Sequence, residues 1–159
     1  MTNFIGPLED RVAIRELLDT YSDAVTRHDA AQWASVWLDS DDCRWMLPSM
    51  AEWAQFRGKA QIVDEWCKMM NQFHGSEGKH NPISQVTVPG KIVVDGDSAT
   101  VRCFTTEFFV TPDGRTLHTK GQYDDVLAKR DGRWFFKDRT WTLFEMGDFW
   151  TIQTDKAEA

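Results

Sequence analysis

Residues 84–110 read SQVTVPGKIVVDGDSATVRCFTTEFFV, and along most of this stretch apolar and polar side chains alternate with a period of two. This period predicts β-strands rather than helices, and it continues to Phe144. The expected strands are Ser84–Val88, Lys91–Val94, Ser98–Val110, Thr116–Ala128 and Arg133–Phe144, with a turn at Pro89-Gly90 between the first two. Consecutive hairpins of this length predict a bent antiparallel meander.

The residues before the sheet have a helical period instead. From Leu8 to about Thr26 the apolar side chains recur at spacings of three and four, which predicts an amphipathic helix. Asp29 is the expected N-cap of a second, short helix, followed by a short strand at Cys43–Leu47 and a third helix at Lys59–Phe73. Helices followed by a curved antiparallel sheet give an α+β fold. The helices cover one face of such a sheet, and its concave side can leave a pocket.

The length and charge of the chain limit what it can be. Its 159 residues predict a single domain over residues 1–150 and a tail over 151–159. The net charge of −7 argues against a nucleic-acid partner, because phosphate backbones attract clustered Lys and Arg. There is no apolar run of membrane-spanning length, no secretion signal and no disulfide framework among the three cysteines, so we expect a cytoplasmic protein. No metal-ligand spacing or cofactor-binding motif occurs, so neither a metal nor a cofactor is expected.

Several short motifs follow one another in a characteristic order: RVAIRELLDTYSDA at 11–24, DGDSAT at 95–100, GQYDD at 121–125, DGRW at 131–134, and Arg139. Through their order and spacing the chain resembles, from about Leu8 to Phe144, the SnoaL-like branch of the nuclear transport factor 2 superfamily. The resemblance implies a cone-shaped curved antiparallel sheet wrapped around the N-terminal helices, a cystatin-like α+β barrel with a deep pocket open at one end.

The family carries several reactions on this fold. It includes polyketide cyclases, scytalone dehydratase, hexachlorocyclohexane dehydrochlorinase, bile-acid 7α-dehydratase and cofactor-free aromatic carbon–carbon lyases, as well as binding proteins without activity. Its enzymes use a His, an acid and often a Tyr, so the resemblance implies general acid–base catalysis without a cofactor. Members commonly pair through the convex face of the sheet, which implies a homodimer. The fold is implied more strongly than the reaction.

The resemblance places a catalytic histidine at His80, which precedes the first long strand, and a pocket tyrosine at Tyr21 on the first helix. The family's dehydratases carry their acid five residues after that tyrosine. Here the residue is Thr26, whose hydroxyl cannot act as a carboxylate. His28 returns to within about 20° of Tyr21 around an ideal helix and could enter the pocket instead. Each of these residues also has a purely structural interpretation. His80 could be a solvated loop residue, Tyr21 a core residue, and His28 a residue at the helix end near solvent.

Glu107 is the candidate to replace the missing acid. It alternates with Thr105 and Phe109 on one face of its strand. Apolar neighbours raise the pKa of a glutamic acid toward the value that a general acid or base needs at neutral pH. The alternative is an outward Glu on a solvated face.

The motif Gly-x-Tyr-x-Asp supplies Tyr123 and Asp125, and Arg139 follows on the next strand. Asp125 and Arg139 could form a purely structural ion pair. Arg139 could instead hold a substrate phenolate or carboxylate with two hydrogen bonds. Lys120 is a second candidate to stabilise an oxyanion. The candidates to stack on substrate rings are Trp45, Phe109 and Trp141.

We therefore expect a cofactor-independent lyase, dehydratase or isomerase that acts on a hydrophobic, aromatic small molecule. His80, helped by Glu107 or Tyr21, would move a proton during an elimination, an isomerisation or a retro-aldol cleavage such as loss of formaldehyde. Two other classes stay open: a non-catalytic ligand-binding or oligomerisation module of the same fold, and a small subunit of a larger enzyme. Thr26 favours the binding module, whereas His80 and Glu107 favour catalysis.

Overall fold

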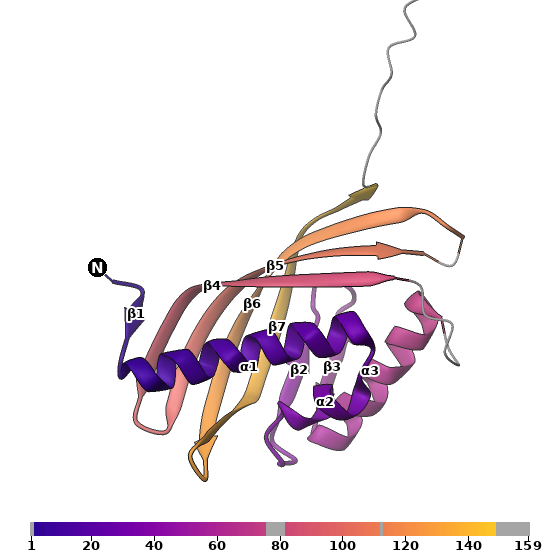
Figure 1. Cartoon of the computed structure of the whole chain (residues 1–159). Helices are drawn as coiled ribbons and strands as arrows, with labels where there is room; N and C mark the ends of the chain where they lie inside the picture. The colour runs from indigo at the N-terminus through magenta and orange to yellow at the C-terminus, as the bar shows by residue number, and fades with distance from the viewer. Residues whose placement is uncertain (1, 76–81, 112, 149–159) are drawn as a thin grey trace, which may run out of the picture.

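The structure, a computed structural model, describes residues 2–75, 82–111 and 113–148. Within these residues seven strands form one curved sheet, and the helices lie on its concave side (Figure 1). The elements are, in chain order, β1 (Phe4–Ile5), α1 (Leu8–Arg27), α2 (Ala30–Ser35), β2 (Arg44–Met46), β3 (Gln55–Arg57), α3 (Lys59–His74), β4 (Ile83–Asp95), β5 (Ser98–Val110), β6 (Thr116–Arg130) and β7 (Arg133–Asp148). The expected tail over residues 151–159 lies outside the described residues.

The strands are ordered β1-β4-β5-β6-β7-β2-β3 across the sheet. β4 to β7 pair antiparallel in sequence order, so the predicted meander is confirmed. β1 pairs parallel with β4, and β2 parallel with β7, so the sheet as a whole is mixed rather than purely antiparallel. The predicted α+β fold is confirmed as an open cone and not a closed barrel, because β1 and β3 remain as two separate edges.

The predicted turn at Pro89-Gly90 is wrong, because β4 runs through it as one strand with a register shift between Pro89 and Lys91. Proline lacks the N–H that a central strand needs, but β1 covers this edge of β4 only at Ile92 and Val93. A Cβ on Gly90 would lie 2.7 Å from the ring of Phe104, so a larger residue here would have to displace that ring. The two residues therefore form a bulge and not a turn.

The first helix covers the concave face of the sheet. Its apolar stripe, which includes Ile14, Leu18 and Tyr21, is buried as predicted. The helix ends at His28, whose φ of 57° is left-handed and turns the chain back. Asp29 then caps α2, as predicted, by accepting a hydrogen bond from the Gln32 N–H at 2.9 Å.

The sequence contains 8 Trp, 10 Phe and 2 Tyr, and some of these aromatic side chains fill the core under the concave face of the sheet. Trp33 of α2 is fully buried and lies at its centre. Its ring centroid is 5.6 Å from Tyr21, 5.4 Å from Trp37 and 4.7 Å from Trp66. The cluster joins three helical segments through ring contacts, each of which contributes about 0.5–1.5 kcal/mol beyond the area it buries.

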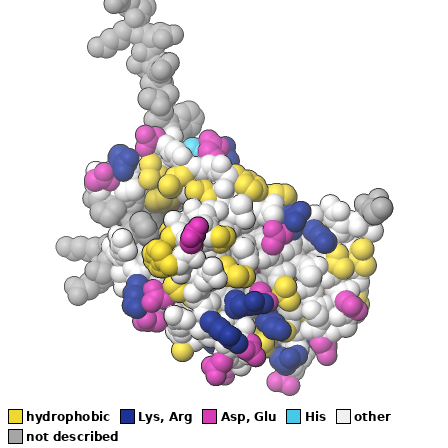
Figure 2. All heavy atoms as spheres, turned by 180° about the vertical axis from the view of Figure 1, so that it is seen from behind, with side chains coloured by type: hydrophobic (Ala, Val, Ile, Leu, Met, Phe, Trp, Pro, Cys, Tyr) yellow, Lys and Arg dark blue, Asp and Glu magenta, His cyan; other side chains and the backbone are white. Residues whose placement is uncertain are grey.

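The outer face of the sheet carries both apolar and charged regions. Figure 2 shows hydrophobic side chains gathered on the upper part of this face and basic ones on its lower part. Val86, Val88 and Phe104 are among the exposed apolar side chains, and the first two project from the edge-side strand β4. In the part of the chain that the structure describes, no helix is both long and apolar enough to cross a membrane.

A polar contact joins the start of α1 to the far end of the sheet. Asp10 Oδ1 accepts hydrogen bonds from Lys129 Nζ at 2.7 Å and from Trp134 Nε1 at 2.9 Å. These bonds, first Lys129 and then Trp134, hold the pKa of Asp10 below its ordinary value despite partial burial. Asp10 therefore ties the first turn of α1 to β6 and β7.

We expect Asp10→Ala to lower the free energy of unfolding by about 1–3 kcal/mol, because it leaves the buried Trp134 N–H without its acceptor. Urea denaturation at neutral pH measures the change, with Glu9→Ala, at the exposed neighbour of Asp10, as the control. The Asp10 contribution is present above the ordinary pKa of 3.8 and is lost as the pH falls through the lowered folded-state pKa. Equal stability of the two variants would contradict this assignment.

Candidate active site

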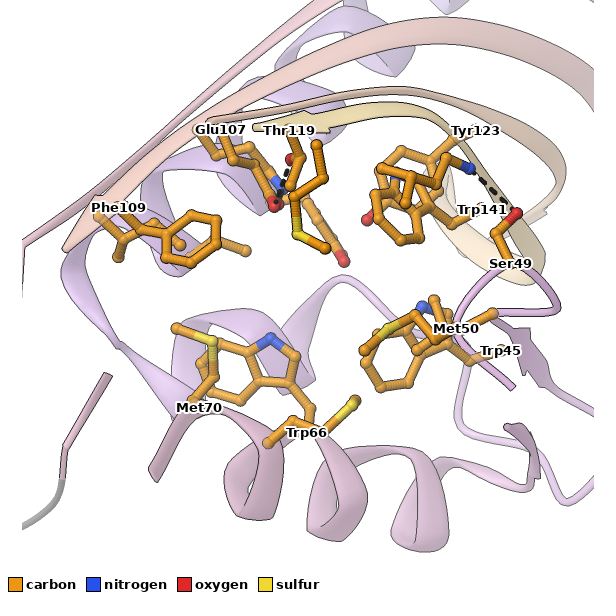
Figure 3. A pocket seen from close by; sticks show the side chains of 18 residues that line it. Trp45, Ser49, Met50, Trp66, Met70, Glu107, Phe109, Thr119, Tyr123 and Trp141 are labelled. Atoms are coloured by element: carbon orange, nitrogen blue, oxygen red, sulfur yellow. Dashed lines mark hydrogen bonds between the residues drawn. The ribbon is translucent and has the colours of Figure 1, made fainter. Parts of the chain in front are cut away.

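A cavity of about 360 Å³ lies between the concave face of the sheet and α3 (Figure 3). Its walls are mostly apolar. The aromatic side chains around it are Tyr21, Trp45, Trp66, Phe109, Tyr123 and Trp141, and four methionines lie among them: Met50, Met69, Met70 and Met146. Cavities of this size and polarity are typical sites for small organic ligands.

One carboxyl group, that of Glu107 on β5, lies in the cavity wall. Its Oε1 accepts a hydrogen bond from Gln85 Nε2 at 2.6 Å, and its Oε2 accepts one from Thr119 Oγ1 at 3.1 Å. The partners come from the two neighbouring strands, so the carboxyl group is held from both sides (Figure 3). It keeps one orientation toward the cavity and still has lone pairs available there.

The position of Glu107 follows from strand register. Gln85 is paired directly with Glu107, Glu107 with Thr119, and Thr119 with Met146. These four residues, which we call the cross-strand row, therefore project on the same side of four adjacent strands. Sequence reasoning identified Glu107 from its alternation with Phe109, but it missed Gln85 and Thr119.

Burial raises the pKa of Glu107, and the hydrogen bonds from Gln85 and Thr119 offset only part of that rise. A carboxyl group in this state can give or take a proton near neutral pH more readily than an exposed one. The site therefore holds a positioned group capable of general acid–base chemistry.

Two phenol groups lie beside the carboxyl group in the same cavity. Tyr21 comes from α1 and Tyr123 from β6, and their rings meet edge to face with centroids 6.0 Å apart. Burial raises the pKa of both phenols, so they stay protonated at neutral pH. Tyr123 donates a hydrogen bond to Tyr21, so it is the Tyr21 hydroxyl group that keeps its hydrogen for an oxygen atom of a ligand.

Arg139 and Asp125 lie behind these tyrosines and do not line the cavity. Arg139 Nη1 is 3.4 Å from Asp125 Oδ2, and both side chains are fully buried. The guanidinium carbon lies 4.1 Å from the ring centre of Tyr21 and 3.7 Å from that of Tyr123. Burial raises the pKa of Asp125 to about 7, although Arg139 opposes the shift. Of the two alternatives, Arg139 thus forms the ion pair with Asp125, and it does not line the cavity where a substrate would bind. Its cation–π contacts support the two phenols.

Lys120 also lies outside the cavity. It follows the inward-facing Thr119, so strand alternation turns it to the opposite face, where it forms an ion pair with Glu145 at 3.0 Å. The expectation that Lys120 meets a developing oxyanion in the pocket is therefore not met.

The end of α1 differs from expectation as well. Thr26 does not line the cavity, and its Oγ1 accepts a hydrogen bond from the backbone N–H of Gln85 at 3.1 Å. His28 ends the helix in a left-handed conformation, which takes it off the ideal helical path that would have brought it beside Tyr21, and it is not part of the cavity wall. Thr26 therefore connects α1 to β4, next to the strand that carries Glu107.

Several sequence candidates do meet in one place. Tyr21, Trp45, Glu107, Phe109, Tyr123 and Trp141 all line the cavity. His80 falls in residues 76–81 and so lies outside the described residues. Among those that are described, no group of three or more His, Cys, Asp or Glu side chains could hold a metal ion.

The sequence matches a model of the SnoaL-like domain over residues 6–140. The chain belongs to this SnoaL-like family. No curated protein matches it.

Solved structures share the fold of this SnoaL-like protein at low sequence identity. A hexachlorocyclohexane dehydrochlorinase (LinA, type 2) is 15% identical with a TM-score of 0.74, over 91% of this chain and 92% of the other. A scytalone dehydratase-like protein from Novosphingobium aromaticivorans is 21% identical with a TM-score of 0.71, over 89% of each chain. A nuclear transport factor 2-like protein from Salmonella enterica is 20% identical with a TM-score of 0.69, over 83% and 89%. At this identity the likeness shows the fold alone.

The raised pKa of Glu107 predicts a pH dependence of stability. Between the ordinary value of 4.5 and the raised folded-state value, the folded protein binds more protons than the unfolded chain. Protonated Glu107 therefore contributes fully to the free energy of unfolding below pH 4.5. This contribution is lost as the pH rises through the folded-state pKa. We expect Glu107→Gln to gain stability relative to the wild type as the pH increases from about 4 to about 8.

Urea denaturation across that pH range measures the difference. The free energy that the variant loses with its second carboxylate oxygen is the same at every pH. It therefore does not affect how the difference between the variant and the wild type changes with pH. Glu145→Gln is the control of opposite sign, because the hydrogen bond from Lys120 lowers the pKa of Glu145. A difference for Glu107→Gln that stays flat or falls with pH would show that Glu107 is not desolvated in the folded protein.

Proposed function

We propose that this SnoaL-like protein is a cofactor-independent lyase, dehydratase or isomerase that acts on a hydrophobic, aromatic small molecule. The observation that carries the proposal is the carboxyl group of Glu107, held by Gln85 and Thr119 inside a mostly apolar cavity. Burying a carboxyl group among aromatic rings costs free energy. If this position served only a hydrophobic core or an apolar binding pocket, an apolar residue in place of Glu107 would make the protein more stable.

In the proposed reaction Glu107 takes a proton from a carbon or hydroxyl group of the substrate. In an elimination the electron pair left behind forms the new double bond, and the leaving group departs with the electrons of its own bond. In a retro-aldol cleavage the electron pair of the deprotonated hydroxyl group forms the C=O bond of formaldehyde, and the electrons of the broken carbon–carbon bond pass to the carbonyl oxygen of the substrate. The phenol of Tyr21, which accepts a hydrogen bond from Tyr123, can donate one to the oxygen atom on which negative charge develops. This chemistry covers an elimination and a retro-aldol cleavage with loss of formaldehyde.

We propose His80 as a second proton-transfer group. It lies three residues before Ile83, whose side chain lines the cavity. An imidazole titrates near neutral pH, and in its protonated form it can donate its own proton to the leaving group while Glu107 takes one from the substrate.

Two of the similar structures support the class of reaction by their names. A dehydrochlorinase eliminates hydrogen chloride and a dehydratase eliminates water. Both steps need a base and a leaving group and no redox cofactor, which is compatible with the residues in this cavity.

A non-catalytic ligand-binding module is the second candidate, and Thr26 favours it. Its hydroxyl is engaged with the backbone of Gln85, at the position where the resemblance leads us to expect an acid. In that case the cavity would hold the same kind of ligand without converting it.

We also propose that the protein works as a cytoplasmic homodimer with no nucleic-acid partner. Val86, Val88 and Phe104 on the outer face of the sheet offer apolar surface for a second copy.

We expect Glu107→Gln to lower kcat by about 100- to 10,000-fold while ligand affinity changes little, because the amide keeps the shape but cannot accept the proton. A panel of phenolic dimers, hydroxysteroids, polyketide-like compounds and hexachlorocyclohexane, followed by mass spectrometry for loss of water, hydrogen chloride or formaldehyde, first identifies the substrate. Glu145→Gln on the outer face is the control. Undiminished turnover in Glu107→Gln would remove Glu107 from the mechanism.

We expect His80→Ala to lower turnover of the same substrate by at least about 100-fold, with partial rescue by added imidazole. His118→Ala is the control, because His118 is absent from the cavity wall. Unchanged turnover in His80→Ala would remove that role. Tight binding from the panel without any turnover by the wild type would favour the binding module instead.

A further inference from the structure

The strand that holds Glu107 from one side is itself held by the first helix. Thr26 Oγ1, near the end of α1, accepts a hydrogen bond from the backbone N–H of Gln85 at 3.1 Å. One helical turn earlier, Ser22 Oγ donates a hydrogen bond to Thr87 Oγ1 at 2.8 Å. Four residues of helix rise by about 6 Å and two residues of strand by about 6.7 Å, so the two contacts match in spacing. They join α1 to β4 at two successive points.

The backbone N–H of Gln85 points away from β5, toward the border of the sheet. The strand on that side, β1, pairs with β4 at Ile92 and Val93, so at Gln85 the hydroxyl group of Thr26 takes the place of a strand. In an antiparallel ladder the N–H and C=O of one residue point to the same side. Gln85 and Glu107 therefore form a non-hydrogen-bonded pair, the kind in which the two side chains lie closer together.

This pairing lets the side chain of Gln85 reach the carboxyl group, and its Nε2 donates to Glu107 Oε1 at 2.6 Å. Gln85 is 6% exposed, and its Oε1 has no hydrogen-bond partner in the part of the chain that the structure describes. A buried amide whose oxygen is unpaired costs free energy, so packing alone gives no reason for a glutamine here. The contribution of this amide is its bond to Glu107.

The two donors around Glu107 oppose the effect of burial. Burial raises the pKa of Glu107, and the hydrogen bonds from Gln85 and then Thr119 lower it. Each bond favours the ionised carboxylate, which is the form that accepts a proton. Figure 3 shows these bonds at the sheet side of the cavity.

The other titratable groups in the described cavity wall are phenols. α1 contributes Tyr21 and β6 contributes Tyr123, whereas the wall residues of β4, β7, α3, β2 and the segment after β2 include none. Burial raises the pKa of both phenols, and Arg139 lies behind them against their rings. His80, proposed above as a second proton-transfer group, lies outside the described residues. The titration of Glu107 is therefore best followed at its own carboxyl carbon.

We propose that Thr26 and Gln85 are positioning residues for Glu107. Thr26 fixes the backbone of Gln85, and the amide of Gln85 holds the carboxyl group in the orientation and the ionised form that accept a proton. The hydroxyl group of Thr26 thereby serves the site without lining the cavity. This inference rests on the proposed function for the role of Glu107 as a base.

Carbon-13 NMR of the Glu107 carboxyl carbon, assigned by its loss in Glu107→Gln, measures the pKa without any substrate. Gln85→Met removes the donor and keeps the length of the side chain, and we expect it to raise that pKa by about one unit or more. Thr26→Val keeps the shape of threonine without its hydroxyl group, and we expect a rise of about 0.3 to 1 unit. Thr26→Ser keeps the hydroxyl group and should return the pKa to the wild-type value.

Ser22→Ala is the matched control, because it removes the neighbouring contact between α1 and β4 and leaves Thr26, Gln85 and Glu107 in place. It should lower stability in urea about as much as Thr26→Val and leave the pKa of Glu107 unchanged. An unchanged pKa in Gln85→Met would overturn the proposal, and so would equal shifts in Thr26→Val and Ser22→Ala. Gln85→Met leaves the backbone contact with Thr26 intact, so it still tests the proposal where Thr26→Val does not fold.

Turnover of the substrate found with the ligand panel gives a second readout. Gln85→Met and Thr26→Val should shift the acid limb of the pH profile of kcat to higher pH, with little change in KM. On that limb a pKa rise of one unit lowers the ionised fraction, and kcat with it, about 10-fold. Full turnover in Glu107→Gln would contradict the proposed function while the pKa shifts persist. Loss of turnover in Glu107→Gln with an unchanged pKa in Gln85→Met would contradict the positioning alone.

Discussion

The register of the four long strands governs the rest of this molecule. Because β4, β5, β6 and β7 pair in sequence order, Gln85, Glu107, Thr119 and Met146 come to lie side by side across the concave face. A slip of one residue in any of these pairings would turn the slipped strand's member of the row to the outer face. The helices then need only cover the sheet, and the cavity forms where the aromatic side chains of α3 and the strands do not fill the cone.

The buried guanidinium group of Arg139, beneath the cavity, is stabilised by aromatic contacts as well as by an ion pair. Arg139 has one carboxylate partner at 3.4 Å and lies against the rings of Tyr21, Tyr123 and Phe136. Removing one member of such a pair leaves an uncompensated charge in the core, which is usually far more costly than removing both. The two tyrosines therefore serve two purposes, since they cover the cation on one side and present hydroxyl groups to the cavity on the other.

The sequence predicted the fold well because hydrophobic periods of 3.6 and 2 extend over long elements such as α1, β5 and β6. It predicted the inward direction of Glu107 because Phe109, two residues along the same strand, is apolar. The partners of Glu107 depend on register between strands, which no local pattern encodes, and the mistaken turn at Pro89-Gly90 hid the continuity of β4.

Lys120 could have been assigned correctly, since its odd spacing from Tyr123 places the two residues on opposite faces. Phe136 and Arg139 both face inward despite their odd spacing, because a register shift opposite Val126 and Leu127 changes the alternation of β7, a local irregularity that the sequence does not signal.

The bulge in β4 has a consequence for the behaviour of the protein at high concentration. Beyond the two residues that pair with β1, the outer edge of β4 has no partner strand, so a strand of another molecule could add where its backbone groups are not taken, as the N–H of Gln85 is by Thr26 Oγ1. Pro89 interrupts that edge, because it offers no N–H and bends the strand where the register shifts. At the other end the sheet finishes in β3, whose three residues are too few to template a strand. The open cone is thereby protected at both borders against edge-to-edge aggregation, without the closure that a barrel would provide.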